Sequence, residues 1–274
     1  MKLLLGQLAP KRGVLEANLR RIASGVRPGL AEVAVFPELF LSGYRVGDRV
    51  HELALRRDDG HISKLQAIAQ RAATSLVVGA PMASTDRPGE TWNAVLVVPP
   101  DGPPSVQVKR FLPTYGPFEE GVHFTPTDRS TPVALAGPRV GLMICYDSFF
   151  PEVGRELARA GAELLIVVSA SPVTSRALFE KVLPARAVEN GCPVVYVNRV
   201  GVEDSIVFGG GTGAWDARGE PLPLAPVESE GLGDEELVGI AELDLTDVPR
   251  WRPFRPVLRD LEAHPSSPVP AGDR

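Results

Sequence analysis

The sequence predicts an α/β sandwich whose sheet is largely buried. Apolar runs of strand length, rich in Val, Ile and Leu and bounded by Gly or Pro, recur along the chain. Segments with the apolar repeat of amphipathic helices lie between them. The 274 residues, 44% of them hydrophobic, are enough to bury one large core. We therefore predict a single domain over residues 1–264, followed by a Pro-, Ser- and Gly-rich tail over residues 265–274.

The predicted elements alternate in the order typical of α/β layers. Strands are expected at residues 3–8, 32–36, 76–80, 93–98, 139–144, 163–169 and 193–198. Helices are expected at residues 15–26 and 62–72, from Pro151 to Gly161, and at residues 178–188 with an interruption or restart at Pro184. Residues 227–236 and the tail are expected to be loops.

Composition argues against several classes of function. The 29 basic and 34 acidic residues give a net charge of −5, and no dense run of Lys or Arg suggests a nucleic-acid partner. No apolar stretch approaches the ~20 residues that span a bilayer, and the apolar start is too short for a secretory leader. The two cysteines lie in unrelated contexts, which fits a reducing cytoplasm. We therefore expect a cytoplasmic protein without a membrane partner.

A carboxylate directly follows one of the buried strands. Phe36 and Pro37 lead from the apolar run into Glu38, which Leu39 and Phe40 follow. Buried strands of α/β folds expose reactive groups at their ends. Partial desolvation by these apolar neighbours would suit Glu38 to general-base chemistry. The alternative interpretation is a strand-capping Glu in solvent.

A lysine ends a second predicted strand. Lys109 follows the alternating residues 106–108 in a chain whose basic residues are mostly Arg. An ammonium group is a compact charge that can approach a developing oxyanion closely. The alternative is a solvated lysine at the edge of a sheet.

A cysteine ends a third predicted strand. Cys145 follows the apolar residues 140–144 and precedes the segment that opens a helix at Pro151. A thiol at a sharp strand-to-helix turn is exposed, and nearby backbone amides can stabilise a thiolate or an oxyanion. The alternative is a small thiol that packs in the core, which is the role we assign to Cys192.

Other chemical signals are weak. The glycine-rich residues 209–214 lead into a strand and turn rather than a helix, so they do not predict a dinucleotide site. The histidines and cysteines lack metal-ligand spacing, and no serine lies in a G-x-S-x-G motif. We predict no cofactor and no metal. A Cys–His hydrolase that uses His123 is the nearest rival mechanism.

Taken together, these segments resemble the nitrilase superfamily of carbon-nitrogen hydrolases. The resemblance covers roughly residues 2–245 and rests on four matching segments, which are residues 36–44, 109–113, 145–152 and 198–201. It implies a four-layer α-β-β-α sandwich that assembles into homodimers or larger oligomers through the helix after the cysteine. It also implies a Glu-Lys-Cys triad on the three strand ends.

By the same resemblance, Glu38 takes the thiol proton and Cys145 attacks the substrate carbonyl. Lys109 and the backbone amide of Tyr146 would hold the oxyanion. A second carboxylate of the family falls on Glu120, whereas its neighbour Glu119 is expected to be solvated.

Residues 109–120 read K-x-x-L-P-x-Y-G-x-F-x-E, which is similar to the glutaminase domain of glutamine-dependent NAD synthetases. That similarity implies a substrate pocket lined by Tyr115, Tyr146, Phe149 and Ser171. Arg176 is a candidate anchor for a substrate carboxylate. The chain departs from that branch because no synthetase domain follows and no S-G-G-x-D-S loop is present. We expect a free-standing amidase or a separate glutaminase subunit.

The predicted function is hydrolysis of a small carboxamide, glutamine-like or another ω-amide, to a carboxylate and ammonia through a cysteine thioester. Hydrolysis of an N-carbamoyl amino acid or a nitrile remains an alternative, because the same triad serves all three. A catalytically silent scaffold is the alternative outside enzymes. Retention of Glu38, Lys109, Cys145 and Glu120 in the sequence argues against such a scaffold.

Overall fold

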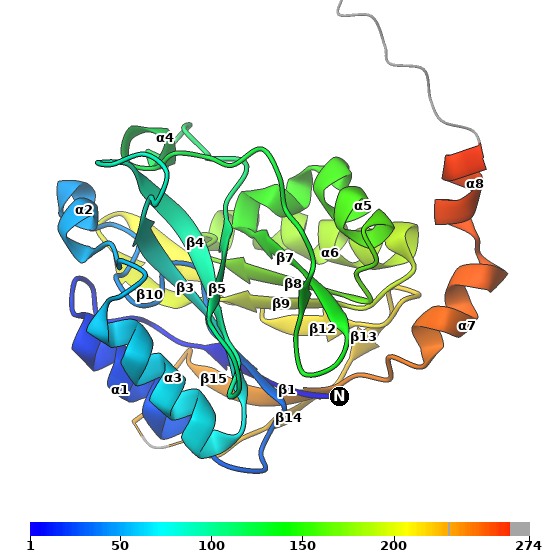
Figure 1. Cartoon of the computed structure of the whole chain (residues 1–274), viewed down its shortest axis with the longest axis horizontal. Coiled ribbons are helices and arrows are strands. Elements are labelled where there is room, and N and C mark those ends of the chain that lie inside the picture. Colours follow the sequence, from blue (N-terminus) through cyan, green and yellow to red (C-terminus); the bar gives the residue numbers. More distant parts are fainter. Residues whose placement is uncertain (230, 264–274) are drawn as a thin grey trace, which may run out of the picture.

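Two stacked β-sheets form the centre of the molecule (Figure 1). The computed structural model describes residues 1–229 and 231–263. In spatial order, the first sheet contains β14 (Leu224–Pro226), β15 (Leu237–Glu242), β1 (Lys2–Gln7), β2 (Val33–Val35), β3 (Ser75–Ala83), β4 (Thr91–Val98) and β5 (Ser105–Val108). The second contains β13 (Pro221–Leu222), β12 (Gly213–Trp215), β9 (Val194–Asn198), β8 (Leu164–Ser169), β7 (Arg139–Ile144) and β6 (Val133–Ala134).

Each sheet has a parallel centre and antiparallel edges. Strands β1, β2 and β3 run parallel in the first sheet, as β7, β8 and β9 do in the second. Parallel neighbours need a crossover, and the predicted helices supply it. The carboxyl ends of these central strands consequently meet at one edge, where the reactive residues lie.

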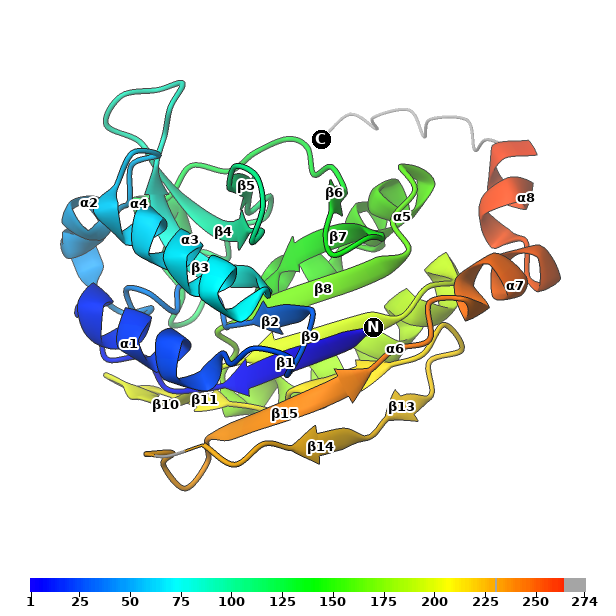
Figure 2. The same cartoon turned by 60° about the horizontal axis from the view of Figure 1, so that its bottom comes forward.

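Helices cover the outer face of each sheet (Figure 2). The first sheet carries α1 (Leu15–Gly25) and α3 (Gly60–Ala72), whereas the second carries α5 (Pro151–Arg159) and α6 (Arg176–Asn190). The remaining helices are short, namely η1 (Gly47–Arg49), α2 (Val50–Leu53), α4 (Glu120–His123), η2 (Cys145–Phe149), η3 (Val173–Ser175), α7 (Asp247–Phe254) and α8 (Val257–Ala263). Strands β10 (Val200–Glu203) and β11 (Ile206–Gly209) form a separate hairpin.

Three apolar clusters fill the spaces between these layers. On β1, Leu4 faces the cluster under α1 and α3, whereas Leu3 and Leu5 face the cluster between the sheets. This is the two-residue alternation of a strand, and both faces are buried. The third cluster lies between β7–β9 and the two helices α5 and α6, with Leu157 and Leu183 at its centre. The predicted four-layer α-β-β-α sandwich is therefore confirmed.

The helix α6 corrects one prediction from the sequence. We expected an interruption or restart at Pro184, but α6 continues through it from Arg176 to Asn190. Proline inside a helix costs about 3 kcal/mol because it lacks an N–H and clashes with the preceding turn. Phe179, Leu183 and Ala187 on either side of Pro184 are buried against the sheet, and this packing offsets the cost.

Two further predictions concern the remainder of the chain. Residues 227–229 and 231–236 contain no regular element, as predicted for this acidic stretch. The predicted tail, residues 265–274, lies outside the described residues. Across the described part of the chain, no helix has both the length and the apolar character to cross a membrane.

Candidate active site

The ends of three strands bring Glu38, Lys109 and Cys145 together. Lys109 follows β5 and Cys145 follows β7, whereas Glu38 lies three residues beyond β2. The Lys109 Nζ lies 2.6 Å from Glu38 Oε1 and 2.8 Å from Oε1 of Glu120. The charges of Glu38 and Lys109 both act on the Cys145 thiol. The structure thus places the predicted triad and Glu120 in one buried group.

A strained turn presents the thiol. Cys145 has φ of 48°, in the left-handed region that side chains other than Gly seldom adopt. Asp147 stabilises this turn, since its carboxylate accepts from the backbone N–H groups of Ile144 at 3.1 Å and Phe111 at 2.9 Å. Burial raises the pKa of Asp147 to about 6. One carboxylate therefore ties the turn of the nucleophile to the segment that follows Lys109.

Hydrogen bonds from several elements hold Glu38. Its Oε1 accepts from Lys109 and from Asn93 Nδ2 at 2.7 Å, and its Oε2 accepts from the backbone N–H of Ala170 at 2.8 Å. The Gly79 backbone packs directly beneath, where a Cβ would lie 2.3 Å from the Pro37 carbonyl oxygen. Both sheets thus fix the position of the candidate base.

The second carboxylate, Glu120, accepts three hydrogen bonds. The donors are Lys109, the Tyr44 hydroxyl at 2.6 Å and Asn93 Nδ2 at 3.2 Å. Burial raises the pKa of Glu120 to about 7, although the Lys109 charge opposes the shift. Since every donor favours the acceptor form, the observed geometry is that of an ionised carboxylate.

Burial also sets the protonation of the other two groups. It raises the pKa of Cys145 above its usual value, and the Glu38 carboxylate adds to the shift. Burial alone would lower the pKa of Lys109, but the charges of Glu120 and Glu38 outweigh it and hold that pKa above its usual value. At neutral pH the resting site therefore contains a thiol and an ammonium group, so attack requires a base.

A cleft of about 220 Å³ opens beside Cys145. The predicted substrate-binding residues Tyr115, Tyr146, Phe149 and Ser171 all line it. Arg176 does not, because its side chain is 54% exposed and its Nε pairs with Glu180 Oε1 at 3.1 Å. The expected carboxylate anchor is thus misplaced, since the first turn of α6 directs it toward its own helix.

His123 lies in a neighbouring recess of about 130 Å³. Tyr44 and Glu120 line both spaces, so they separate His123 from the cleft that holds Cys145. Its Nδ1 lies 3.7 Å from Asp48 Oδ1. This placement does not support the rival Cys–His mechanism. Among residues 1–229 and 231–263, no cluster of His, Cys, Asp and Glu is arranged to hold a metal ion.

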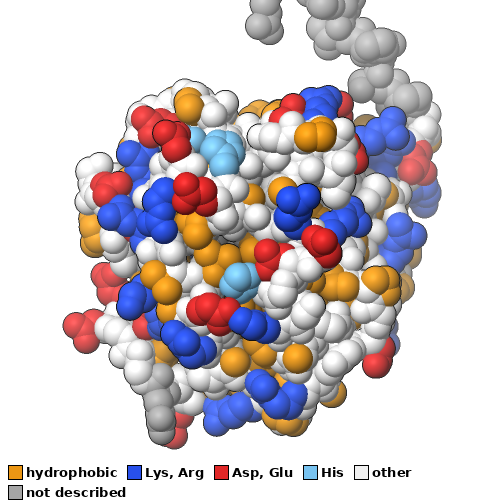
Figure 3. All heavy atoms as spheres, turned by 60° about the vertical axis from the view of Figure 1, so that its left-hand side comes forward, with side chains coloured by type: hydrophobic (Ala, Val, Ile, Leu, Met, Phe, Trp, Pro, Cys, Tyr) orange, Lys and Arg blue, Asp and Glu red, His pale blue; other side chains and the backbone are white. Residues whose placement is uncertain are grey.

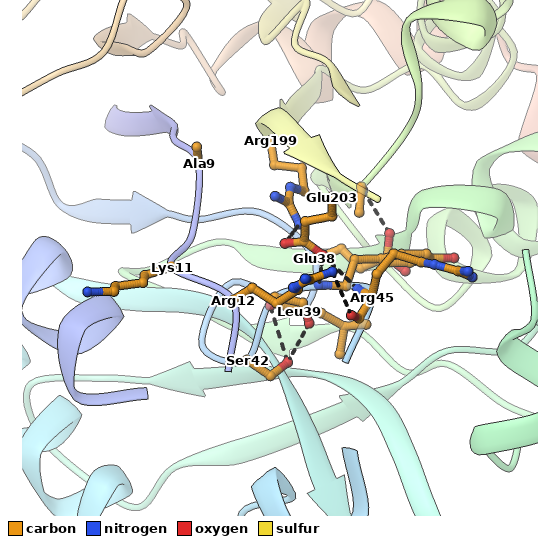
Figure 4. Close-up of polar contacts among 12 residues, drawn as sticks. Ala9, Lys11, Arg12, Glu38, Leu39, Ser42, Arg45, Arg199 and Glu203 are labelled. Carbon is orange, nitrogen blue, oxygen red and sulfur yellow. Dashed lines mark hydrogen bonds and ion pairs between the residues drawn. The ribbon is translucent and has the colours of Figure 1, made fainter. Parts of the chain in front are cut away.

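A buried ion pair between Arg199 and Glu203, both labelled in Figure 4, supports the segment of Tyr44 and Arg45. Arg199 Nη1 lies 2.5 Å from Glu203 Oε1, and its guanidinium carbon lies 3.9 Å from the centre of the Phe208 ring. Glu203 Oε2 accepts from the backbone N–H groups of Tyr44 and Arg45 at 2.9 and 2.6 Å. The pair therefore positions the hydroxyl that donates to Glu120.

Sequence reasoning assigned no role to Asn93, Asp147 or this ion pair. Asn93 gave a signal, because it is a polar residue inside the apolar run of β4. Asp147 lay inside a segment of the resemblance. Nothing in the spacing of Arg199 and Glu203 indicated that both would be buried.

Comparison with known proteins places this chain in a family. The model of the carbon-nitrogen hydrolase family matches residues 5–253, which is most of the chain. The chain belongs to the carbon-nitrogen hydrolase family. This match confirms the resemblance to the nitrilase superfamily that the sequence indicated.

Three known proteins illustrate what this carbon-nitrogen hydrolase is similar to. The chain is 34% identical to an (R)-stereoselective amidase of Pseudomonas sp., over 95% of this chain and 91% of that protein. It is 31% identical to a glutamine-dependent NAD(+) synthetase of Thermotoga maritima, over 100% of this chain but 47% of that protein. The structure of an amidase from Nesterenkonia AN1 matches with a TM-score of 0.78 and 28% identity, over 96% of this chain and 94% of that one.

Proposed function

We propose that this carbon-nitrogen hydrolase converts a small primary carboxamide to a carboxylate and ammonia through a thioester at Cys145. The observation that carries the proposal is the buried ammonium group of Lys109 between two carboxylates, beside a thiol on a strained turn. A charge fixed in this way can stabilise an oxyanion without reorganising during the reaction.

The first half of the reaction forms the thioester. Glu38 takes the proton of the Cys145 thiol as sulfur attacks the carbonyl carbon. The carbonyl oxygen becomes an oxyanion, which Lys109 and the Tyr146 backbone N–H stabilise. When the tetrahedral intermediate collapses, Glu38 returns its proton to the nitrogen and the carbon-nitrogen bond breaks. Ammonia leaves, and the acyl group remains on sulfur.

The second half releases the acid. Glu38, again unprotonated, takes a proton from water as the hydroxyl oxygen attacks the thioester carbon. The same two donors stabilise the second oxyanion. The carbon-sulfur bond then breaks, the thiol regains its proton from Glu38, and the carboxylic acid leaves and loses its proton to solvent. Each turnover thus consumes one water and restores the protein.

Two relatives support an amide rather than a nitrile as substrate. The Pseudomonas and Nesterenkonia proteins are both amidases. In a mutant of the Nesterenkonia amidase, the acetamide moiety of fluoroacetamide adds covalently at the active-site cysteine. An N-carbamoyl amino acid would need a carboxylate anchor, which Arg176 does not supply in this structure.

Ammonia release from a panel of primary amides, nitriles and N-carbamoyl amino acids tests the proposal. Cys145→Ala should abolish turnover, whereas Cys192→Ala should retain it, because Cys192 is a buried thiol whose charged neighbours are Arg252 and Arg155 rather than the triad. Glu38→Gln and Lys109→Ala should each lose several orders of magnitude in kcat/KM. Hydroxylamine should intercept the thioester of the wild-type protein as a hydroxamate.

Three results would contradict this mechanism. Turnover by Cys145→Ala above a contamination control would exclude a thioester. A preference for the nitrile or the N-carbamoyl substrate would overturn the substrate assignment. Absence of both turnover and hydroxamate from every substrate would favour the silent scaffold.

A further inference from the structure

The cleft beside Cys145 is walled mainly by aromatic side chains. Phe149 and Phe179 meet edge to face, with ring centres 4.9 Å apart and planes at 82°. Tyr146 continues this array, with its ring centre 6.0 Å from that of Phe149, and Tyr115 meets Tyr146 at 5.5 Å and 61° and Phe118 at 5.5 Å and 75°. Such walls present both ring faces and ring edges to a bound group, so another ring can pack among them in the preferred edge-to-face geometry.

The apolar lining continues to the mouth of the cleft. Leu178 lines the cleft and is 51% exposed, and Tyr115 is 53% exposed. Exposed large apolar side chains around a concave site are typical of a surface that binds an apolar ligand. A substrate entering here therefore meets apolar contacts before it reaches the thiol.

The described residues place no Lys or Arg side chain in the lining of this cleft. The carboxylates of Glu38 and Glu120 already neutralise Lys109, which lies behind the cleft. The ionised group in the wall of the cleft is Glu120. A substrate carboxylate would lose its water and face a negative charge without a matching cation, which is unfavourable in a buried site.

Two arginines of the neighbouring surface are also paired with carboxylates. Arg45 lines the adjacent recess and binds Glu119 Oε2 at 2.9 Å, with Asp204 Oδ2 at 3.5 Å. Arg12 binds the same Asp204 at 2.6 Å. Figure 3 shows basic and acidic side chains interspersed over the face that carries α2, α4 and β10. The guanidinium groups of Arg12 and Arg45 are thus already engaged by carboxylates.

The size of the cleft limits the acyl group. An apolar cavity of about 150 Å³ holds a benzene molecule. A cleft of about 220 Å³ therefore accommodates one six-membered ring together with a carboxamide. It leaves little room for two rings or a long chain.

We infer that the preferred substrate is a neutral primary amide whose acyl group carries one apolar ring, as in phenylacetamide or benzamide. This inference rests on the proposed amide hydrolysis. It also replaces the glutamine-like substrate expected from the sequence, because no Lys or Arg among the described lining residues would pair with the α-carboxylate of glutamine.

Kinetics with matched amides test the inference. We would measure kcat/KM for phenylacetamide, hexanamide, 4-carbamoylbutanoate and L-glutamine by ammonia release. The kcat/KM for phenylacetamide should exceed that for each charged substrate by about a hundredfold, and the kcat/KM for hexanamide should lie between the two. A preference below about tenfold over either charged substrate, or a preference for glutamine, would overturn the inference while leaving amide hydrolysis intact.

A pair of arginine substitutions locates the effect in the cleft. Leu178→Arg adds a cation at the mouth and should reduce the preference for phenylacetamide over 4-carbamoylbutanoate at least tenfold. Phe254→Arg adds the same charge at a residue that is 79% exposed on α7, outside the cleft, and should leave that ratio unchanged. Equal ratios in the two variants would overturn the assignment of specificity to this cleft.

Binding to Cys145→Ala separates failure of this inference from failure of the proposed function. Calorimetry should detect phenylacetamide and not L-glutamine in the inactive variant. If phenylacetamide binds but the wild-type protein releases no ammonia from it, the proposed function is wrong and the specificity stands. Tighter binding of L-glutamine would overturn the specificity whatever the activity.

Discussion

The buried ion pair of Arg199 and Glu203 allows a sharp test of how this site is held in place. The two groups lie 2.5 Å apart, with side chains 1% and 4% exposed. Nearby, Arg12 and Asp204 form a pair at 2.6 Å, but with side chains 46% and 49% exposed. Arg12 and Glu203, both labelled in Figure 4, lie against the same residue, Gly43. The two pairs differ mainly in burial, so one is a matched control for the other.

The structure sets different costs for the two halves of the buried pair. Removing one partner of such a pair costs about 3–5 kcal/mol, because the other charge stays buried without compensation. In Arg199→Met, Glu203 keeps the backbone donors of Tyr44 and Arg45, so we expect a loss of about 3 kcal/mol. In Glu203→Gln, the guanidinium keeps the Phe208 ring but loses its carboxylate, and we expect about 5 kcal/mol.

Urea unfolding at pH 7 and fixed protein concentration measures these costs. Arg12→Met removes an exposed pair and should cost about 1 kcal/mol or less. Glu203→Gln should also lower kcat, because the backbone N–H groups of Tyr44 and Arg45 then lose their carboxylate acceptor, and this segment carries the hydroxyl that donates to Glu120. In the double variant Arg199→Met/Glu203→Gln, the two losses should not add, because each removes the same contact. Equal destabilisation by Arg12→Met and Arg199→Met would refute the argument from burial.

Three further predictions follow from the geometry. Gly79→Ala places a Cβ 2.3 Å from the Pro37 carbonyl oxygen, so it should displace Glu38 and lower kcat about a hundredfold, whereas Gly25→Ala, with no neighbour within 4 Å, should not. Burial raises the pKa of Glu120 to about 7, and its hydrogen bonds require the ionised form, so wild-type kcat/KM should rise with pH through that value. Glu120→Gln should lower kcat and abolish this rise. An unchanged pH profile in Glu120→Gln would contradict this role of Glu120. The protein should be a dimer or larger that associates through the outward, charged face of α5. Arg159→Glu should therefore shift the mass measured by light scattering toward that of the monomer. A monomeric wild-type protein at micromolar concentration would count against this interface.

The sequence could predict the strands and the reactive residues because both depend on local pattern. Central strands buried on both faces give continuous apolar runs, and these runs located β1, β2, β3, β4, β7, β8 and β9. A polar residue directly after such a run lies at a strand end, whatever the rest of the fold does. The positions of Glu38, Lys109 and Cys145 near strand ends could be predicted in this way, whereas their common role as a triad was implied by the resemblance to the nitrilase superfamily.

The rest depended on contacts between distant segments. Strand β15 pairs with β1, so Leu237 joins Gln7 across most of the chain length, and no local pattern marks that partner. Arg176 shows a different limit. It is close in sequence to Ser171, which lines the cleft, but the direction of a side chain depends on the turn that carries it, and at the start of α6 the Arg176 guanidinium pairs with Glu180. Specificity is therefore harder to predict than chemistry.

The protonation of the site explains why it uses two carboxylates. The sequence suggested a thiolate stabilised by backbone amides, but burial and Glu38 favour the thiol in the resting protein. A thiol is a weak nucleophile, so it needs a base at the moment of attack, and Glu38 lies in the right group to serve. If Glu38 were the only carboxylate beside Lys109, it would have to act both as the ion-pair partner of the ammonium group and as the base. Because Glu120 also accepts from Lys109, the ammonium group keeps one carboxylate partner when Glu38 becomes protonated in the proposed mechanism, and it stays available to the oxyanion through both halves of the proposed reaction.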